Sequence, residues 1–227
     1  MASEPCRLGR RAIERDESRS GQGLKVLTLT RDFYGRDTVR VAKELLGTYL
    51  VRVKGKSRMV GRIVEVEAYR GSDDPASHAF RGLTLRNEPM FGEPGHAYIY
   101  FTYGNHYCLN VTTQKSGTPG AVLVRALEPL QGLVTMRQLR PKVSDIELTN
   151  GPGKLTKAFG IDKSLNKVDL TRPGPLFISP GSGEPLKIVR SARVGIREGT
   201  DRLWRFYIAD CQYVSKHRHE KPGFQSA

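Results

Sequence analysis

The chain has 227 residues and a formal net charge of +14, because 37 Lys and Arg residues outnumber 23 Asp and Glu residues. This length fits one large domain or two small ones, and it is enough to bury a hydrophobic core without help from disulfides or metal. With 38% hydrophobic and 26% charged residues, the composition excludes wholesale disorder. No apolar run approaches the roughly 18 residues of a membrane span.

The charge and the cysteines narrow the class of protein. A strongly basic chain indicates a polyanionic partner, nucleic acid first and an anionic membrane second, although a basic solvated surface gives the same number. The three cysteines, Cys6, Cys108 and Cys211, form an odd and widely spaced set that indicates a reducing compartment. The sequence has no Cys-x-x-Cys pair and no apolar segment of the secretory type near its start, so we expect an intracellular protein.

The chain divides into a polar arm, one domain and a short tail. Residues 1–24 hold five Arg and four acidic residues, a net of +1 (5 − 4), and their lack of large apolar side chains is typical of a disordered arm. Residues 25–213 contain no linker or repeat and are expected to form the single domain. Residues 214–227 are typical of a flexible tail. Its His217 and His219 could form a metal site with Cys211, but a polar tail is a poor scaffold and we expect no metal.

In chain order, the predicted elements are mostly strands. A helix is expected over residues 38–46, where Thr38 can cap the first turn and Gly47 stops the last. The elements that follow are strands over 49–53 and 59–69, a long surface loop over 70–95, a hairpin of 97–103 and 107–112, a strand over 121–127, helices over 130–139 and 152–159, and strands over 176–178, 187–189 and 203–208. Because the strands cluster without regular βαβ alternation, we predict a single α+β domain. It has a curved, largely antiparallel sheet, surrounding helices and a protruding hairpin.

The strand over residues 61–69 gives the strongest indication of chemistry. Alternation gives it two faces, one with Ile63, Glu65, Glu67 and Tyr69 and the other with Val64, Val66 and Ala68. Because burying an unpaired carboxylate is costly, the first face either pairs with cations such as Arg62 or Arg125 or lines a wet site. The two carboxylates lie roughly 6.5–7 Å apart along a strand, within the range for inverting glycoside hydrolysis. The second interpretation is therefore a water-activating base that cleaves a bond at an anomeric carbon, in a sugar polymer or in a nucleoside.

A hairpin turn at Gly104 and Asn105 places Tyr103 at the tip. A ring at this position is either a tyrosine on the rim of the sheet or a wedge that enters between stacked bases from the minor groove. A three-residue loop that begins at Gly104 would pair Tyr100 with Asn110 on one face, whereas a two-residue loop would put them on opposite faces. If both residues line a pocket, we predict the longer loop.

The segment from Asn150 to Lys154, NGPGK, is a candidate phosphate site at the start of a predicted helix. The N–H groups around Gly153, the positive end of the helix dipole and the Lys154 ammonium converge there. The spacing is not that of a P-loop, so we expect a contact to a backbone phosphate. A plain proline-initiated helix start would show the same residues.

Six motifs follow one another along residues 29–208: GRIVEVEAY, SHAFRGLTLRNEPMF, YIYFTYGNHYCLN, GAVLVRALEPLQGL, NGPGKL and ARVGI. In type and order they resemble the alkyladenine (3-methyladenine) DNA glycosylases, the single-domain type without a helix-hairpin-helix. The resemblance implies that Glu67 is the general base that activates water, with Arg125 and the backbone carbonyl of Val194 holding that water. It also implies a pocket for the extruded base and a residue that replaces it in the duplex. Tyr69 and Tyr100 would sandwich the base, His78 and the Ala76 backbone would contact its edge, Asn110 would screen out the exocyclic amino group of normal guanine, and Tyr103 would fill the gap in the stack.

The expected activity is that of a monofunctional glycosylase of base-excision repair. A base inside a duplex must be flipped out before its N-glycosidic bond can be hydrolysed. No matching position carries a lysine or amine nucleophile, so we expect an abasic product without strand cleavage. The implied partner is double-stranded DNA with alkylated, deaminated or etheno purines. We expect no cofactor, no membrane and a monomer that works with DNA, in the nucleus of a eukaryote or in the cytoplasm and nucleoid of a bacterium.

Two other interpretations of the same residues stay open. One is a non-catalytic damaged-DNA-binding protein of the same fold. The other is a carbohydrate glycosidase that uses Glu65 and Glu67, which the net charge and the tip tyrosine disfavour.

Overall fold

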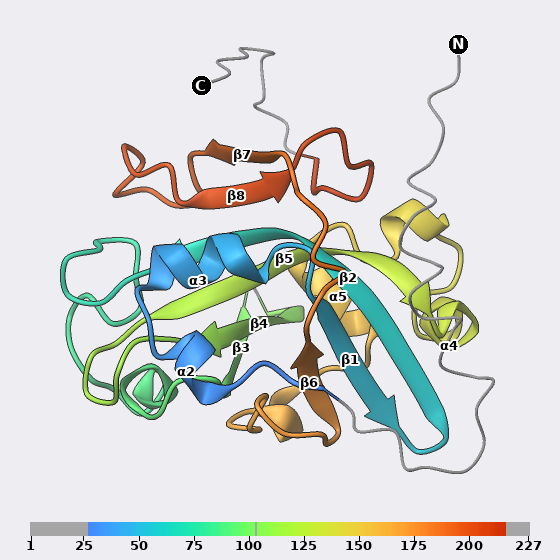
Figure 1. The fold of residues 1–227 in the computed structure, drawn as a ribbon, viewed down its shortest axis with the longest axis horizontal. Helices are drawn as coiled ribbons and strands as arrows, with labels where there is room; N and C mark the ends of the chain where they lie inside the picture. The colour runs from blue at the N-terminus through green and yellow to red at the C-terminus, as the bar shows by residue number, and fades with distance from the viewer. Residues whose placement is uncertain (1–26, 103, 217–227) are drawn as a thin grey trace.

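The computed structural model describes residues 27–102 and 104–216, and this part of the chain is built on an eight-stranded sheet (Figure 1). Its strand pairs are antiparallel, and the order is β3-β4-β5-β2-β1-β6, with β8 pairing with both β2 and β7. The strands are β1 (Tyr49–Lys54), β2 (Ser57–Tyr69), β3 (Ala97–Thr102), β4 (His106–Thr112), β5 (Ala121–Gln131), β6 (Leu176–Ser179), β7 (Ile188–Ser191) and β8 (Arg205–Ile208).

Short helices pack on this curled sheet, which confirms the predicted α+β class. The α-helices are α2 (Arg31–Tyr34), α3 (Thr38–Leu45), α4 (Leu133–Leu139) and α5 (Pro152–Ala158), and the 3-10 turns are η1 (Glu88–Phe91), η2 (Asp145–Glu147) and η3 (Lys163–Leu165). Helix α3 packs against β2 and β5, and α5 packs against β4 and β5. In the part of the chain that the structure describes, no helix is long and apolar enough to cross a membrane.

The predicted arm, residues 1–24, and residues 217–227 of the predicted tail lie outside the described residues. The division into arm, domain and tail therefore stays a prediction. The same holds for a metal site that would use His217 and His219.

The cap of α3 differs from the prediction. Asp37, not Thr38, is the N-cap, because its carboxylate accepts the backbone N–H groups of Val39 at 3.0 Å and Arg40 at 3.1 Å. Thr38 is instead fully buried, and its hydroxyl is hydrogen-bonded to the hydroxyl of Thr113. An aspartate directly before the expected cap is the better capping group of the two.

The helix predicted over residues 130–139 begins three residues later. Strand β5 continues to Gln131, which pairs with Val60 on β2. Gly132 then turns the chain with φ of 81°, and a Cβ at this position would lie 2.6 Å from the carbonyl oxygen of Arg58. Glycine both permits the left-handed backbone and allows the close approach, so the helix starts after it.

Strand β2 lies at the centre of the sheet and carries the candidate carboxylates. Its register with β5 shifts between Ile63 and Glu65 and again between Glu65 and Val66. This irregularity breaks the simple alternation, because Ile63 joins Val64 and Val66 in the apolar core and does not accompany the carboxylates.

The β3–β4 hairpin has a three-residue connection, but not the predicted one. Thr102 pairs with His106, so the connection begins at residue 103 and not at Gly104. As a result Tyr100 pairs with Cys108, two pairs away from the pair that Asn110 forms with Tyr98. The two residues still share one face of the hairpin, as expected, but the predicted direct pairing is wrong. Tyr103 itself is outside the described residues.

The long loop over residues 70–95 is anchored onto the sheet. Ala79 and Met90 pack against Tyr98 of β3 in a small buried cluster. The Asn87 side chain is 1% exposed and donates hydrogen bonds to the backbone carbonyl of His78 at 2.8 Å. The loop therefore brings His78 to a fixed place beside β3.

Candidate active site

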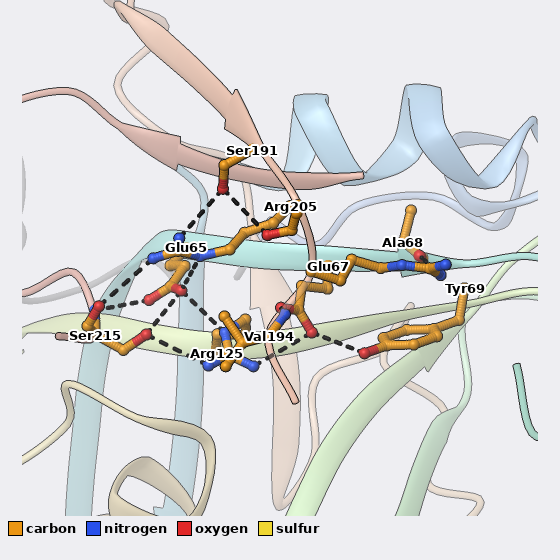
Figure 2. Close-up of polar contacts among 11 residues, drawn as sticks. Glu65, Glu67, Ala68, Tyr69, Arg125, Ser191, Val194, Arg205 and Ser215 are labelled. Atoms are coloured by element: carbon orange, nitrogen blue, oxygen red, sulfur yellow. Dashed lines mark hydrogen bonds and ion pairs between the residues drawn. The ribbon is translucent and has the colours of Figure 1, made fainter. Parts of the chain in front are cut away.

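Glu67 is fully buried on β2, and three groups contact its carboxylate (Figure 2). The Tyr69 hydroxyl donates to Oε2 at 2.8 Å, and the backbone N–H of Val194 donates to Oε1 at 2.7 Å. The Arg125 guanidinium lies 3.2 Å from Oε2. Four residues that the sequence singled out are thus brought together from β2, β5 and the segment between β7 and β8.

The contact of Val194 with Glu67 is made by its amide. The resemblance implies a role for the carbonyl of the same residue toward a water molecule. That role stays a prediction, whereas the N–H···O bond to Glu67 is a further contact that the sequence did not indicate.

Glu65, the other carboxylate on β2, lies at the centre of an adjoining ionic cluster, which shares Arg125 with Glu67 (Figure 2). Its Oε1 accepts from Arg125 Nε at 2.9 Å and Arg205 Nε at 2.7 Å. Ser215 adds its hydroxyl at 2.8 Å to Oε1 and its backbone N–H at 2.7 Å to Oε2. Burial alone would raise the pKa of Glu65, but the Arg125 and Arg205 charges and the Ser215 hydrogen bonds hold it below its usual value. The salt-bridge interpretation therefore applies to Glu65.

The sequence suggested Arg62 or Arg125 as the cation that pairs with the carboxylates of β2, and in the structure Arg125 has this place. Arg62 pairs with Glu128, the residue directly opposite it on β5, with Nη2 2.6 Å from Oε2. Arg125 instead lies between Glu65 and Glu67 and contacts both. Burial lowers the pKa of Arg125, but the two carboxylates outweigh it and raise that pKa, so the guanidinium stays charged.

Aromatic side chains form the second part of the site. Burial and the neighbouring Glu67 carboxylate raise the pKa of Tyr69, so its hydroxyl stays protonated and donates to Glu67. On β3, the Tyr100 ring lies edge-on to His78 with a centroid distance of 4.6 Å. The Tyr98 hydroxyl lies 2.9 Å from His78 Nδ1. Alternation along residues 97–102 places Tyr98 on the same face as Tyr100, which is the signal that could have identified it.

His78 is neutral at physiological pH. The residue as a whole is exposed, but the partial burial of its ring and the nearby Arg86 charge lower the pKa of His78 to about 4. Burial raises the pKa of Tyr98 to about 12, so this hydroxyl keeps its proton. When Tyr98 donates that proton to Nδ1, the neutral imidazole carries its own hydrogen on Nε2 and presents a donor.

The pairing of residues across β4, β5 and β2 shows how far the aromatic side chains of the hairpin lie from Glu67. Asn110 on β4 lies opposite Leu123 on β5, and Leu123 lies opposite Glu67 on β2. Residues that face each other across a ladder point to one side of a sheet, and two strand spacings amount to about 10 Å. Leu123, 5% exposed, therefore lies between the two polar side chains, and the sequence did not single it out.

Asn110 and Ala76 each have one polar contact that fixes them. The Asn110 amide is 3% exposed, and its Nδ2 donates to the Tyr98 carbonyl at 3.0 Å. The Ala76 N–H donates to the Asp74 carboxylate at 3.3 Å. Asp74 in turn forms a fully buried ion pair with Arg193, and neither residue was identified from the sequence.

A cleft of about 1150 Å³ lies beside the ionic cluster, with Arg125 and Ser215 among its lining residues. The predicted phosphate residues Gly153 and Lys154 also line it, and the Lys154 ammonium donates to Asn150 Oδ1 at 2.8 Å. The other cationic side chains along it are Arg140, Lys157 and Lys216. Among the described residues, no group of three His, Cys, Asp or Glu side chains could hold a metal ion.

Comparison with known proteins gives consistent matches over this part of the chain. The sequence model of the family described as "Methylpurine-DNA glycosylase (MPG)" matches residues 32–212. A protein of Carboxydothermus hydrogenoformans is 51% identical over 193 residues, covering 84% of this chain and 100% of the relative. Proteins of Methanoculleus marisnigri (50% over 195 residues, 84% and 100%) and Methanocella arvoryzae (48% over 192 residues, 83% and 96%) are similar. All three carry the name "Putative 3-methyladenine DNA glycosylase".

Proposed function

The chain belongs to the methylpurine-DNA glycosylase family, and we propose that it excises 3-methyladenine and related damaged purines from double-stranded DNA with a water molecule activated by Glu67. The family and its relatives show the coarser activity, that of a DNA glycosylase that hydrolyses N-glycosyl bonds. The finer steps below are supported by the geometry of the described residues.

The surroundings of Glu67 suit a general base. Arg125, Tyr69 and the Val194 amide all present positive or donor groups to its carboxylate, which is an arrangement that stabilises an anion. A carboxylate held in this way takes a proton from the attacking water, and its charge also stabilises the oxocarbenium-like sugar. An alkylated purine such as 3-methyladenine carries positive charge and leaves readily, so no acid is needed at the leaving base.

The aromatic group suits recognition of an extruded base. Tyr69 and Tyr100 provide flat surfaces for stacking, and the Nε2–H of neutral His78 provides a donor at the edge. Asn110, held by the Tyr98 carbonyl, would reject the exocyclic amino group of guanine. Tyr103 would fill the space that the extruded nucleotide leaves in the duplex.

The basic cleft suits the DNA backbone. Lys154, Lys157, Arg140 and Lys216 present cations along one surface next to the ionic cluster, and cations of this kind neutralise phosphates and release counterions. We propose that the protein works there as a monomer. We also propose that it leaves an abasic site without a covalent intermediate, because the contacts of Glu67 among the described residues come from Tyr69, Val194 and Arg125 and not from a lysine.

The observation that carries this proposal is the fully buried Glu67 with its three donors. Its test is Glu67→Gln in single-turnover excision on duplexes that contain 3-methyladenine, 7-methylguanine, hypoxanthine or ethenoadenine. We expect a loss on the order of 10²–10⁴-fold, with binding to a duplex that contains a stable abasic analogue retained.

The matched control is Glu88→Gln, which changes an exposed carboxylate paired with Lys167 and should leave the rate unchanged. An unchanged rate in Glu67→Gln would overturn the mechanism. Absence of an abasic product from the wild-type protein in excess, on every duplex of the panel, would favour the non-catalytic damaged-DNA-binding protein.

A further inference from the structure

Arg193 and Asp74 form an ion pair that the proposed chemistry does not use. Both side chains are 0% exposed, and the guanidinium meets the carboxylate through two parallel bonds, Nη1 to Oδ2 at 2.6 Å and Nη2 to Oδ1 at 2.8 Å. A buried ion pair is weak evidence for stability, because the cost of desolvating both charges offsets most of their attraction. The other contacts of the pair show what it orders.

On one side, the pair holds the end of β2. Arg193 Nη1 also donates to the backbone carbonyl of Ala68 at 2.9 Å. The guanidinium carbon lies 4.7 Å from the centroid of the Tyr69 ring, so the cation covers that ring. Arg193 therefore fixes Tyr69 in two ways, through the backbone carbonyl of the preceding residue and through contact with the face of its ring.

On the other side, the pair holds the loop that follows β2. The Asp74 carboxylate accepts the backbone N–H groups of Arg70 at 3.1 Å and Ala76 at 3.3 Å. Ala76 lies two residues before His78, which borders the aromatic group. The loop is thereby attached at its start to the same guanidinium that covers Tyr69.

These contacts converge on Glu67. The Tyr69 hydroxyl and the Val194 N–H both donate to its carboxylate. Tyr69 lies against Arg193, and Val194 is the next residue after it in the chain. Two of the three groups that contact Glu67 therefore depend on Arg193 for their position, while the third, Arg125, is held from the opposite side by Glu65.

On the basis of the function proposed above, we propose that Arg193 and Asp74 are positioning residues for base excision, which set the orientation of Glu67 through Tyr69 and the Val194 amide and place the stacking face of Tyr69. Neither residue touches the substrate. Their effect reaches the reaction through geometry, where a misplacement of about 1 Å is enough to cost on the order of 10²-fold in rate.

The test is Arg193→Lys. Lysine keeps a positive charge opposite Asp74, but it has neither the two-pronged fork nor the flat face that covers Tyr69. We expect a fall in the single-turnover excision rate on the order of 10²-fold, with unchanged affinity for a duplex that contains a stable abasic analogue.

The matched control is Arg62→Lys on the same strand, β2. Arg62 also forms a buried pair with a carboxylate, because its Nη2 lies 2.6 Å from Oε2 of Glu128, the residue opposite it on β5. We expect a comparable loss of thermal stability in the two variants and a loss of excision rate in Arg193→Lys alone. An equal rate loss in both variants at equal stability would overturn the proposal, and so would a wild-type rate in Arg193→Lys.

A spectroscopic measurement separates positioning from stability. In the Glu67→Gln background, stacking on Tyr69 should quench the fluorescence of an ethenoadenine base that is bound in the pocket. Adding Arg193→Lys should reduce this quenching, and adding Arg62→Lys should not; unchanged quenching with Arg193→Lys would contradict the placement of Tyr69.

A second variant and the activity of the wild-type protein distinguish a failure of the positioning role from a failure of the proposed function. If Arg193→Lys does not fold, the uncharged pair Asp74→Asn with Arg193→Gln replaces it, since no buried charge is then left alone. A lowered rate in that double variant supports the proposal, and a wild-type rate overturns it. An inactive wild-type protein would refute the proposed function, whereas an active wild type with fully active variants would refute only the positioning role.

Discussion

Glu65 and Glu67 lie two residues apart on one strand and are equally buried, yet their surroundings differ in kind. Two guanidinium groups and both donors of Ser215 converge on Glu65. Glu67 instead receives one tyrosine hydroxyl, one amide and an edge of Arg125. Arg125 is the shared member, so its geometry toward Glu67 depends on the cluster around Glu65.

We predict that Glu65→Gln destabilises the protein by about 3–5 kcal/mol at neutral pH, because Arg125 and Arg205 lose their shared counter-charge in a buried place. The pKa of Glu65 is lower in the folded state than the usual value of about 4.3. Its stabilisation is therefore fully present above that value and is lost as the pH falls through the lower folded pKa. Urea unfolding of wild type and variant should give a difference that is largest near pH 7 and shrinks below about pH 4.

The control for this prediction is Glu88→Gln, whose carboxylate is about half exposed and paired with Lys167. An exposed pair of this kind contributes about 0–1 kcal/mol, so the unfolding free energy should change little at any pH. A Glu65→Gln difference that stays constant from pH 7 to acid would show that the carboxylate charge is not the cause.

At the scale of elements, the segment after β8 completes the cluster around Glu65. Ser215 is 4% exposed, and its hydroxyl and backbone N–H both donate to the Glu65 carboxylate. Arg205 on β8 approaches the same carboxylate, with Nε at 2.7 Å from Oε1. The last described residues of the chain thus lie against the central strand, and they connect it to the basic cleft, which Ser215 and Lys216 also line.

We predict that Ser215→Ala lowers the free energy of unfolding by about 1.5–3 kcal/mol, the usual range for a hydrogen bond to a charged group. The reason is the loss of the 2.8 Å bond from the hydroxyl to Glu65 Oε1 in a buried place. Urea unfolding monitored by tryptophan fluorescence provides the measurement.

Ser164→Ala is the matched control, because that hydroxyl also donates to a carboxylate, Asp162, at 2.6 Å but in an exposed turn. It should change the unfolding free energy by no more than about 0.5 kcal/mol. Equal effects of the two substitutions would mean that burial of the Ser215 bond contributes nothing.

The elements that the sequence predicted well are those with strong local signals. Apolar and β-branched runs predicted the long central strand, and Gly47 marks the end of the predicted helix before it. The errors come from contacts between distant parts of the chain. Strand β5 extends to Gln131 because it pairs with Val60, more than 70 residues earlier, and nothing local to residues 128–131 indicates that pairing.

Part of the candidate site could likewise be predicted from the sequence, and part could not. Glu67 and Arg125 follow from residue type and resemblance, and the structure places them in contact. The Arg193–Asp74 pair was missed because its partners are 119 positions apart, and charged residues in loops are more often solvated than buried. The predicted hairpin loop was displaced by one residue, which shifts the strand pairing by two residues, because Gly104 with its positive φ marks the turn without fixing whether the loop begins at residue 103 or 104.

At the scale of the whole molecule, the buried charges of the site cancel, and the net charge of the chain lies on other residues. Arg125, Arg193 and Arg205 are the buried cations of the site, and Glu65, Glu67 and Asp74 are their buried partners. Three positive and three negative charges give zero, so this cluster contributes nothing to the +14 of the chain. The surplus is therefore on groups other than these, and the cleft with its four exposed or half-buried cations gathers part of it beside the site.

We predict that removing cations from the cleft makes DNA binding less dependent on salt. If Lys154 and Lys157 each neutralise one phosphate, the double variant Lys154→Ala, Lys157→Ala should reduce the slope of log K against log salt by about 0.9 per lost contact. Binding to a duplex with a stable abasic analogue, followed by fluorescence anisotropy over a series of salt concentrations, gives this slope. Lys56→Ala with Lys163→Ala removes two lysines that do not line the cleft, so the slope should stay at the wild-type value. Equal slopes in the two double variants would place the phosphate path outside the cleft, because the salt term counts only the cations that release counterions on binding.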